Sequence, residues 1–492
     1  MPPKSLLLLT LLAAGLGVAG DMLLRGGDLG LGAAILAVAF VGAAALVTKP
    51  FRRTTRLEEL WLWLAVPFFG TCLAWRDAPL LRALDVLAIL LALGLLTLRA
   101  RGVPMLTGGF IQYLRGCASS TAQALAGAAP VALVDLRRAE LPWRRYTVPA
   151  RAATIGLSLA AVPVLVFGSL FSSADPVFEG MVLGLFDWHL GNLIPHFVTA
   201  GVLAWLSAGY LRGMLVADDG ANRQAPAPPP LGLVEIGIPL AGTIAVFTAF
   251  LAIQARYLFG GGEVVLQTAG LTFADYARRG FFELVAAAAL MIPLLLLANW
   301  AFAPAHAKHR AVFRALVIVQ LVLVGALMLS ALHRMALYVD AYGLSQIRVY
   351  ATAFMVWIAG TLGWMALATL RGRSERFMYA AAVRGFGLLA LVNVVNVDGA
   401  IARTNLARAA AGRPLDVAYL TDLSADAAPA IAAALPGLDP ALACPLAQQL
   451  QTAIERYPVD WRAWNLSRWT ARRAVDPVRW QVADCRSAIA DR

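Results

Sequence analysis

Two stretches in the C-terminal third of the chain decide its fold: AYGLSQIRVYATAFMVWIAG (341–360) and NVVNVDGAIARTNLARAAAGRPLDVAYL (393–420). The first passes from a polar turn into an apolar run. The second ends the last apolar run at Asn393, Asn396 and Asp398 and continues as a more polar, Ala-rich segment. Apolar runs precede this region and short amphipathic segments follow it. The region therefore divides the chain into a membrane part and a water-exposed tail.

The composition of the whole chain is that of a membrane protein. Of its 492 residues, 60% are hydrophobic and only 14% are charged, which is outside the range of ordinary soluble domains. The net charge of +12 does not indicate a nucleic-acid partner, because the basic residues gather in short segments between apolar runs. We also expect no cofactor and no metal, since the sequence contains no GxxxxGK[ST], HExxH, CxxC or GxSxG motif.

Eleven apolar runs are long enough to cross a hydrocarbon core of about 30 Å. They lie near 5–20, 29–48, 60–75, 83–98, 152–171, 188–208, 233–253, 281–300, 313–333, 349–370 and 379–397. The sequence thus predicts an all-α fold, a polytopic transmembrane bundle followed by a C-terminal helical domain. Its predicted parts are N-terminal transmembrane helices (1–100), an interfacial amphipathic segment (101–150), a transmembrane bundle (151–397) and the helical domain (398–492).

Charge and cysteine placement predict the orientation of the chain. With the N-terminus inside, most Lys and Arg residues fall in the inner loops, as the positive-inside rule requires, and an odd number of spans places the tail outside the inner membrane. Asp21 and Arg25 directly follow the first run, which favours a retained span over a cleaved signal peptide. In an oxidising compartment Cys444 and Cys485 can form a disulfide worth about 2–4 kcal/mol; two unpaired buried thiols are the alternative.

Two polar clusters are candidate sites in the membrane part. Asp187, His189, Asn192 and His196 occur in DWHLGNLIPHF, where the last three share a helix face. They form either a proton relay or weak metal site, or simple hydrogen bonds between helices. The second cluster is a candidate site for anionic lipid headgroups on the inner surface, with a plain topology signal as the alternative. It consists of Arg137, Arg138, Arg144 and Arg145.

The two deciding stretches, with SADAAPAI and the later DWRAWNLSRWTARRA, resemble a bacterial family of multi-pass membrane proteins described only as a domain of unknown function. The resemblance implies an inner-membrane protein with an extracytoplasmic helical tail, and it implies no activity. From the residues themselves, Arg348 lies in the first turn of a span, where a cation is unfavourable, so we expect it to have a specific partner. We hypothesise that Arg348, Asp398 and Arg403 form a latch that docks the tail.

The sequence favours a non-enzymatic envelope protein that binds a partner through its tail, with the lipid bilayer as its other contact. A transporter or lipid-handling protein is the first alternative. A transferase that uses a lipid-linked substrate is the second, with Asp21, Asp28, Asp175 and Asp187 as its candidate carboxylates. Paired outer carboxylates that face a lateral opening would favour the transferase, and a cavity that reaches His189 and His196 would favour transport.

Overall fold

The computed structural model describes most of the chain as α-helix. The described residues are 3–25, 27–48, 57–100, 105–135, 167, 171, 174–175, 193–215, 231–259, 281–303, 306–371 and 376–475. Within them the only β contact is an isolated bridge between Leu231 and Phe302. The all-α prediction is therefore confirmed for the described part of the chain.

The first half of the bundle contains six helices around one hydrophobic core. They are α1 (Pro3–Leu24), α2 (Leu31–Thr48), α3 (Leu57–Trp75), α4 (Pro79–Ala100), α5 (Phe110–Ala126) and α9 (Leu193–Leu215). Leu9, Leu62 and Leu211 are fully buried in this core. Helices α1 and α9 pack so closely that a Cβ on Gly17 would lie 2.4 Å from the carbonyl oxygen of Ala200. Small residues permit such an approach between membrane helices.

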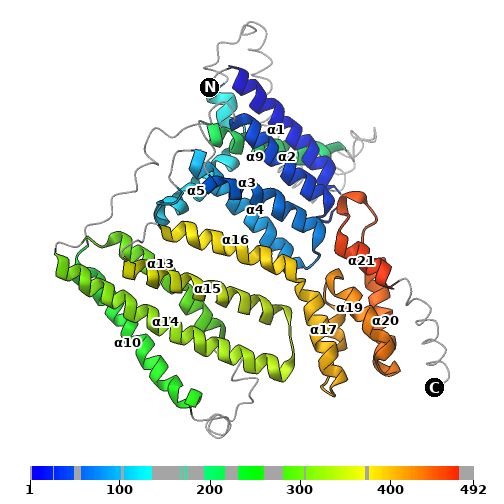
Figure 1. Ribbon diagram of the computed structural model, residues 1–492. Helices are drawn as coiled ribbons and strands as arrows, with labels where there is room; N and C mark the ends of the chain where they lie inside the picture. The colour runs from blue at the N-terminus through cyan, green and yellow to red at the C-terminus, as the bar shows by residue number, and fades with distance from the viewer. Residues whose placement is uncertain are drawn as a thin grey trace.

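The second half has its own core. It comprises α10 (Leu233–Phe259), α13 (Phe281–Ala301), α14 (Ala307–Tyr342) and α15 (Gln346–Arg371), with Met355 and Ile358 fully buried. Pro239 and Pro293 lie inside α10 and α13, which a packed membrane bundle tolerates. Helix α16 (Phe377–Val395) crosses between the halves and contacts both (Figure 1).

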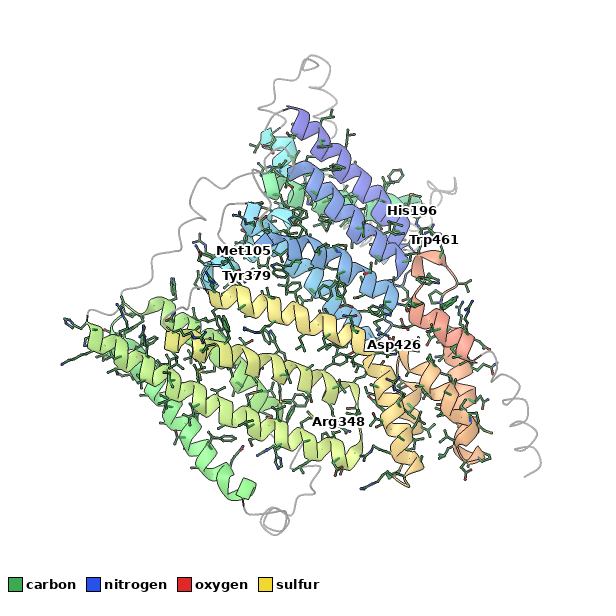
Figure 2. The ribbon with its side chains drawn as sticks, in the orientation of Figure 1. Met105, His196, Arg348, Tyr379, Asp426 and Trp461 are labelled. Carbon is green, nitrogen blue, oxygen red and sulfur yellow. The ribbon has the colours of Figure 1, made fainter. Side chains whose placement is uncertain are left out.

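The tail, which carries Asp426 and Trp461, stands at one end of the bundle (Figure 1, Figure 2). It comprises α17 (Val397–Ala410), α18 (Val417–Thr421), α19 (Ala428–Ala434), α20 (Pro440–Glu455) and α21 (Leu466–Val475), with short 3₁₀ turns at Ala425–Ala427, Leu435–Gly437 and Trp461–Ala463. A third core, which includes Ile401 and Leu446, holds these helices together. Asn396 separates α16 from α17 by adopting a left-handed conformation (φ 53°) and accepting a hydrogen bond from Gly399 N at 2.9 Å.

Eight described helices are long and apolar enough to cross a membrane: Ser5–Leu24, Leu31–Thr48, Pro79–Ala100, Leu233–Gln254, Phe281–Ala301, Ala307–Tyr342, Gln346–Arg371 and Phe377–Val395. The segment Glu59–Trp75 is apolar but shorter. These helices support a multi-pass membrane protein, while the total of eleven spans stays a prediction. The span predicted at 152–171 lies almost wholly outside the described residues.

The packing cuts across the predicted parts of the chain. Helix α9, which falls in the predicted bundle over 151–397, packs against α1, α2, α4 and α5, and the predicted division of the chain stays a prediction. Helix α5, expected along the membrane surface, packs against α4 and α9 and buries Tyr113 and Gly116. The tail core includes Val392 of α16 and Val349 of α15. The tail is therefore continuous with the bundle.

Candidate functional site: a buried polar junction between bundle and tail

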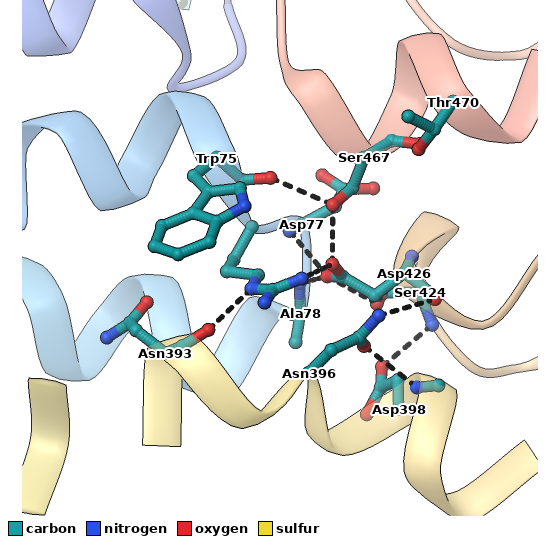
Figure 3. A network of polar contacts seen from close by, with 12 residues as sticks. Trp75, Asp77, Ala78, Asn393, Asn396, Asp398, Ser424, Asp426, Ser467 and Thr470 are labelled. Carbon is teal, nitrogen blue, oxygen red and sulfur yellow. Dashed lines mark hydrogen bonds and ion pairs between the residues drawn. The ribbon is translucent and has the colours of Figure 1, made fainter. Parts of the chain in front are cut away.

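A network of buried polar side chains joins the tail to the bundle (Figure 3). We call it the polar junction; it consists of Arg76, Asp77, Asn393, Asp426, Asn465, Ser467 and Arg468, with the exposed carboxylate of Asp28 at its edge. These residues come from the α1–α2 turn, the α3–α4 turn, the end of α16 and the tail. Arg76, Asp77, Asp426 and Arg468 are each less than 9% exposed. Buried charges are stable only when they are paired and hydrogen-bonded, so the contacts of each define what the junction does.

Asp426 is the centre of the network. Its carboxylate accepts hydrogen bonds from the backbone N–H groups of Asp77 (2.8 Å) and Ala78 (3.3 Å), which immediately precede α4. It also lies 3.2 Å from Arg76 Nη1 and 2.5 Å from the hydroxyl of Ser467 (Figure 3). The carboxylate thereby stabilises the N-terminus of α4, where free N–H groups and the helix dipole favour a negative charge. A tail residue thus completes a membrane helix.

Arg76 connects three elements at once. Its Nε donates to the carbonyl of Asn393 at 2.6 Å, its Nη2 donates to the carbonyl of Val394 at 3.1 Å, and its Nη1 pairs with Asp426. The two carbonyls belong to the last turn of α16, whose terminal carbonyls lack helical partners. A guanidinium suits this place because it presents several donors in a fixed plane.

Arg468 of α21 connects the tail to the α1–α2 turn and the α3–α4 turn. Its Nη2 lies 2.7 Å from Asp77 Oδ1 and its Nη1 lies 3.0 Å from Asp28 Oδ2. Burial raises the pKa of Asp77, and the hydrogen bond and charge of Arg468 offset this only in part. Burial acts to lower the pKa of Arg468, but its hydrogen bond to Asp77 and the charge of that carboxylate raise it overall. Asp77 also pairs with Arg82 of α4 at 3.3 Å, so the two buried charges belong to a chain of ion pairs that includes Asp28, Arg468, Asp77 and Arg82.

Asn465 caps two helices with one side chain. Its amide nitrogen donates to the carbonyls of Leu73 (3.0 Å) and Arg76 (2.8 Å) at the end of α3. Its amide oxygen accepts from the N–H groups of Ser467 (2.9 Å) and Arg468 (3.3 Å) at the start of α21. One side chain thus aligns a membrane helix with a tail helix.

A second contact docks α17 onto the α14–α15 turn. The amide of Asn405 both accepts from Leu344 N (2.9 Å) and donates to Leu344 O (2.8 Å). Arg408 donates to the carbonyl of Asp340 at 2.7 Å. Asp398 is 1% exposed and accepts from Gln346 Nε2 at 2.9 Å and from Ser424 N at 3.0 Å.

The structure places the three predicted latch residues at or near this second contact. Arg348 donates to the carbonyl of Gly343 and its guanidinium lies 4.0 Å from the ring centroid of Tyr338. Arg403 is exposed and makes no ion pair with the described residues. Arg348 and Asp398 thus lie near the tail without pairing with each other, and their docking role stays a prediction.

The predicted intramembrane cluster is only partly within the described residues. His196 lies on α9, and its Nδ1 is 3.2 Å from Asp21 Oδ1 on α1. Asp21 also pairs with Arg25. Asp187, His189 and Asn192 lie outside the described residues, and so do Arg137, Arg138, Arg144, Arg145 and Cys485. Among the residues that the structure describes, no group of three or more His, Cys, Asp or Glu side chains could hold a metal ion.

One known protein family matches most of the length of the chain. Residues 62–434 match the model of a domain of unknown function, DUF4153. The chain belongs to the DUF4153 family. No curated protein and no solved structure matched the chain. The family match confirms the predicted resemblance and extends from α3 to α19.

The DUF4153 match includes Arg76, Asp77, Asn393 and Asp426 but ends before Asn465, Ser467 and Arg468. Asp426 and Arg468 lie in SADAAPAI and DWRAWNLSRWTARRA, two of the segments that carry the family resemblance. No local pattern in the sequence predicts a role for either residue, or for Arg76 and Asp77. The available signal was an Arg-Asp pair in the short turn between two apolar runs, where charges are expected to be exposed.

Proposed function

We propose that this DUF4153 protein is a non-enzymatic component of the bacterial inner membrane that binds an envelope protein through its docked tail. The observation that carries the proposal is an exposed aromatic surface beside the polar junction. Val459 is 87% exposed, and Trp461, Trp464 and Trp469 are 54%, 40% and 39% exposed. Trp and Arg are the side chains that contribute most at the centres of protein interfaces.

Charge on this surface indicates the chemistry of the partner. The guanidinium of Arg473 lies 3.8 Å from the ring centroid of Trp469, and Arg473 makes no ion pair with the described residues. A cation that is stacked on an aromatic ring can still bind a carboxylate from another molecule. The matching partner is an extracytoplasmic protein with acidic side chains around an apolar patch.

The polar junction gives this surface a connection to the membrane. The Trp461–Ala463 turn packs against α2, where Leu31 N donates to Trp464 O at 2.9 Å, and Arg468 in the following helix reaches Asp77 and Asp28. A partner bound at the aromatic surface would therefore act on helices α2 to α4 through buried contacts. Such coupling suits a sensing or accessory role better than catalysis.

Site-specific photocrosslinking tests the proposed binding in intact cells. A photoreactive residue at Val459 is expected to capture a protein, whereas one at exposed Arg413, beyond the end of α17, is not. The W461A/W469A variant should abolish the Val459 product at unchanged abundance, and the purified captured protein should bind the variant at least about tenfold more weakly. Crosslinks to lipid alone would overturn the proposal, because the tryptophans would then be interfacial membrane anchors.

The orientation of the tail needs a separate test. Intact spheroplasts are treated with a membrane-impermeant maleimide, with and without prior reduction, and the labelled cysteines are located by mass spectrometry. Labelling of Cys444 and Cys485 only after reduction is expected for an external tail closed by a disulfide. Labelling that requires broken membranes would place the tail in the cytoplasm and move the search to cytosolic partners.

A further inference from the structure

An apolar groove runs between the two halves of the bundle. Its volume is about 640 Å³, and side chains of α4, α5, α13, α15 and α16 line it. Leu87, Leu91, Leu114 and Phe354 line the groove and are each more than 40% exposed. In a membrane helix bundle such side chains face lipid, so the groove opens toward the bilayer.

A second cavity of about 480 Å³ adjoins the groove at the end of the bundle away from the tail. The two share Phe110, Leu296, Phe377 and Met378 as lining residues. Unlike the groove, this cavity has polar lining from Thr107, Asn299, Thr369 and two arginines. The apolar groove therefore opens into this polar, positively charged cavity, which we call the mouth.

The two arginines, Arg310 and Arg314, are one helical turn apart near the start of α14. Both are exposed and neither makes an ion pair with the described residues. The first turn of α14 contains no acidic residue. Like charges at this spacing, near the positive end of a helix dipole, destabilise a helix unless an anion lies between them. The mouth is therefore electrostatically complementary to an anion.

Unpaired polar atoms occur along the same path. Trp300 lines the mouth, and its buried indole nitrogen has no hydrogen-bond partner among the described residues. The buried hydroxyl of Thr361, in the groove, likewise has none. A buried donor without a partner costs about 1–3 kcal/mol, and an acceptor brought to the mouth by a ligand would offset that cost at Trp300.

We propose that the groove and its mouth bind a membrane phospholipid with an anionic headgroup. The phosphate lies against Arg310 and Arg314, and an acyl chain follows the groove. Trp357 in the groove and Thr369 at the mouth are separated on α15 by about 18 Å, which exceeds half of a hydrocarbon core of about 30 Å. The site goes beyond the proposed tail function, because it uses no residue of the tail or of the polar junction.

Lipid titration of the purified full-length chain in detergent tests the site, with binding followed by native mass spectrometry. Phosphatidylglycerol is compared with phosphatidylcholine of the same acyl chains. The R310Q/R314Q variant should bind phosphatidylglycerol about 30-fold more weakly, because each basic residue contributes about 1 kcal/mol to anionic-lipid binding. The matched control is R371Q, which removes an exposed arginine at the same end of the bundle that does not line the mouth.

Four outcomes decide the proposal. A preference for phosphatidylglycerol that R310Q/R314Q removes and R371Q keeps supports it. Equal binding of both lipids, or an equal loss in R371Q, overturns it. Inorganic phosphate or glycerol phosphate binding as tightly as the lipid would also overturn it, because the groove would then contribute nothing. Loss of the tail function in W461A/W469A leaves this result unaffected.

Discussion

The polar junction and the apolar groove both lie between separate parts of the molecule. They differ in whether their charged and polar side chains have partners within the chain. In the junction, both carboxylate oxygens of Asp426 and all three guanidinium nitrogens of Arg76 have partners within the chain. In the groove and its mouth, Trp300 and Thr361 keep unpaired buried atoms. In the junction, Asn393 Oδ1 is also buried without a partner among the described residues, but the charged groups at its centre are paired. A network of paired buried charges fixes one arrangement, whereas the two arginines at the mouth have no ion-pair partner among the described residues and are free to bind an anion.

The largest effect is expected at the centre of the junction. Asp426→Ala leaves the buried guanidinium of Arg76 without its carboxylate and removes acceptors from the N-terminus of α4. Breaking a buried ion pair by removing one partner costs about 3–5 kcal/mol. The thermal unfolding temperature in detergent should fall, and the segment after Val395 should become sensitive to protease. The control is Asp422→Ala, an exposed acidic residue of the same tail, which should behave like the wild type.

A smaller effect is expected for the Arg468–Asp77 pair. The single variants Arg468→Met and Asp77→Leu should each lower the free energy of unfolding. The double variant should lower it by less than the sum of the two single losses, and the difference, the coupling energy, should be about 1–3 kcal/mol. The physical reason is that each single variant leaves one member of the pair with only its second partner, Arg82 for Asp77 or Asp28 for Arg468, whereas the double variant removes both members. Unfolding free energies from a double-mutant cycle measure this coupling. Strict additivity would mean that Arg468 is held by Asp28 and Asp77 by Arg82, with no contribution from the Arg468–Asp77 contact.

The hypothesised latch residue Arg348 should have a still smaller effect. Arg348→Gln removes the contact with the ring of Tyr338 and one bond to the Gly343 carbonyl. An expected loss of about 1 kcal/mol follows from the size of a cation–π contact. Protease resistance of the tail should decrease slightly. Unchanged resistance would show that Asn405 and Arg408 dock α17 without help from Arg348.

The smallest effect on stability is expected in the groove. Ala353→Leu adds apolar volume beside groove-lining side chains and should change the unfolding free energy by no more than about 0.5 kcal/mol. It should nevertheless reduce the amount of phospholipid that copurifies with the chain, as measured by quantitative lipid mass spectrometry. A strong destabilisation would instead show that Ala353 belongs to the packed core, like the junction residues.

Several features of the fold could be predicted because they depend on local composition. Membrane helices require about 20 apolar residues in succession. The apolar runs therefore predicted α1, α2 and α13 to α16 from the sequence alone. The end of α16 was readable from Asn393, Asn396 and Asp398. Exact helix bounds were less accurate: α14 extends over 36 residues, well beyond the run at 313–333.

The candidate sites were harder to predict, because they depend on contacts between distant segments. His196 pairs with Asp21, 175 positions away, and Asn465 caps α3 across more than 380 positions. Arg76 looked like a charge in a short exposed turn, yet it is buried because the tail folds over it. No local pattern encodes such a partner.

The sequence by itself determined that this DUF4153 protein is a helical membrane protein with a polar tail, because hydrophobicity, span length and turn chemistry act within one segment. The tertiary structure alone decided that α9 packs on α1, that Asp426 and Arg468 join the tail to α3 and α4, and that Arg310 and Arg314 stand at the mouth of an apolar groove. These features arise from packing and from the pairing of buried charges. Both depend on distances between segments that only the folded chain defines.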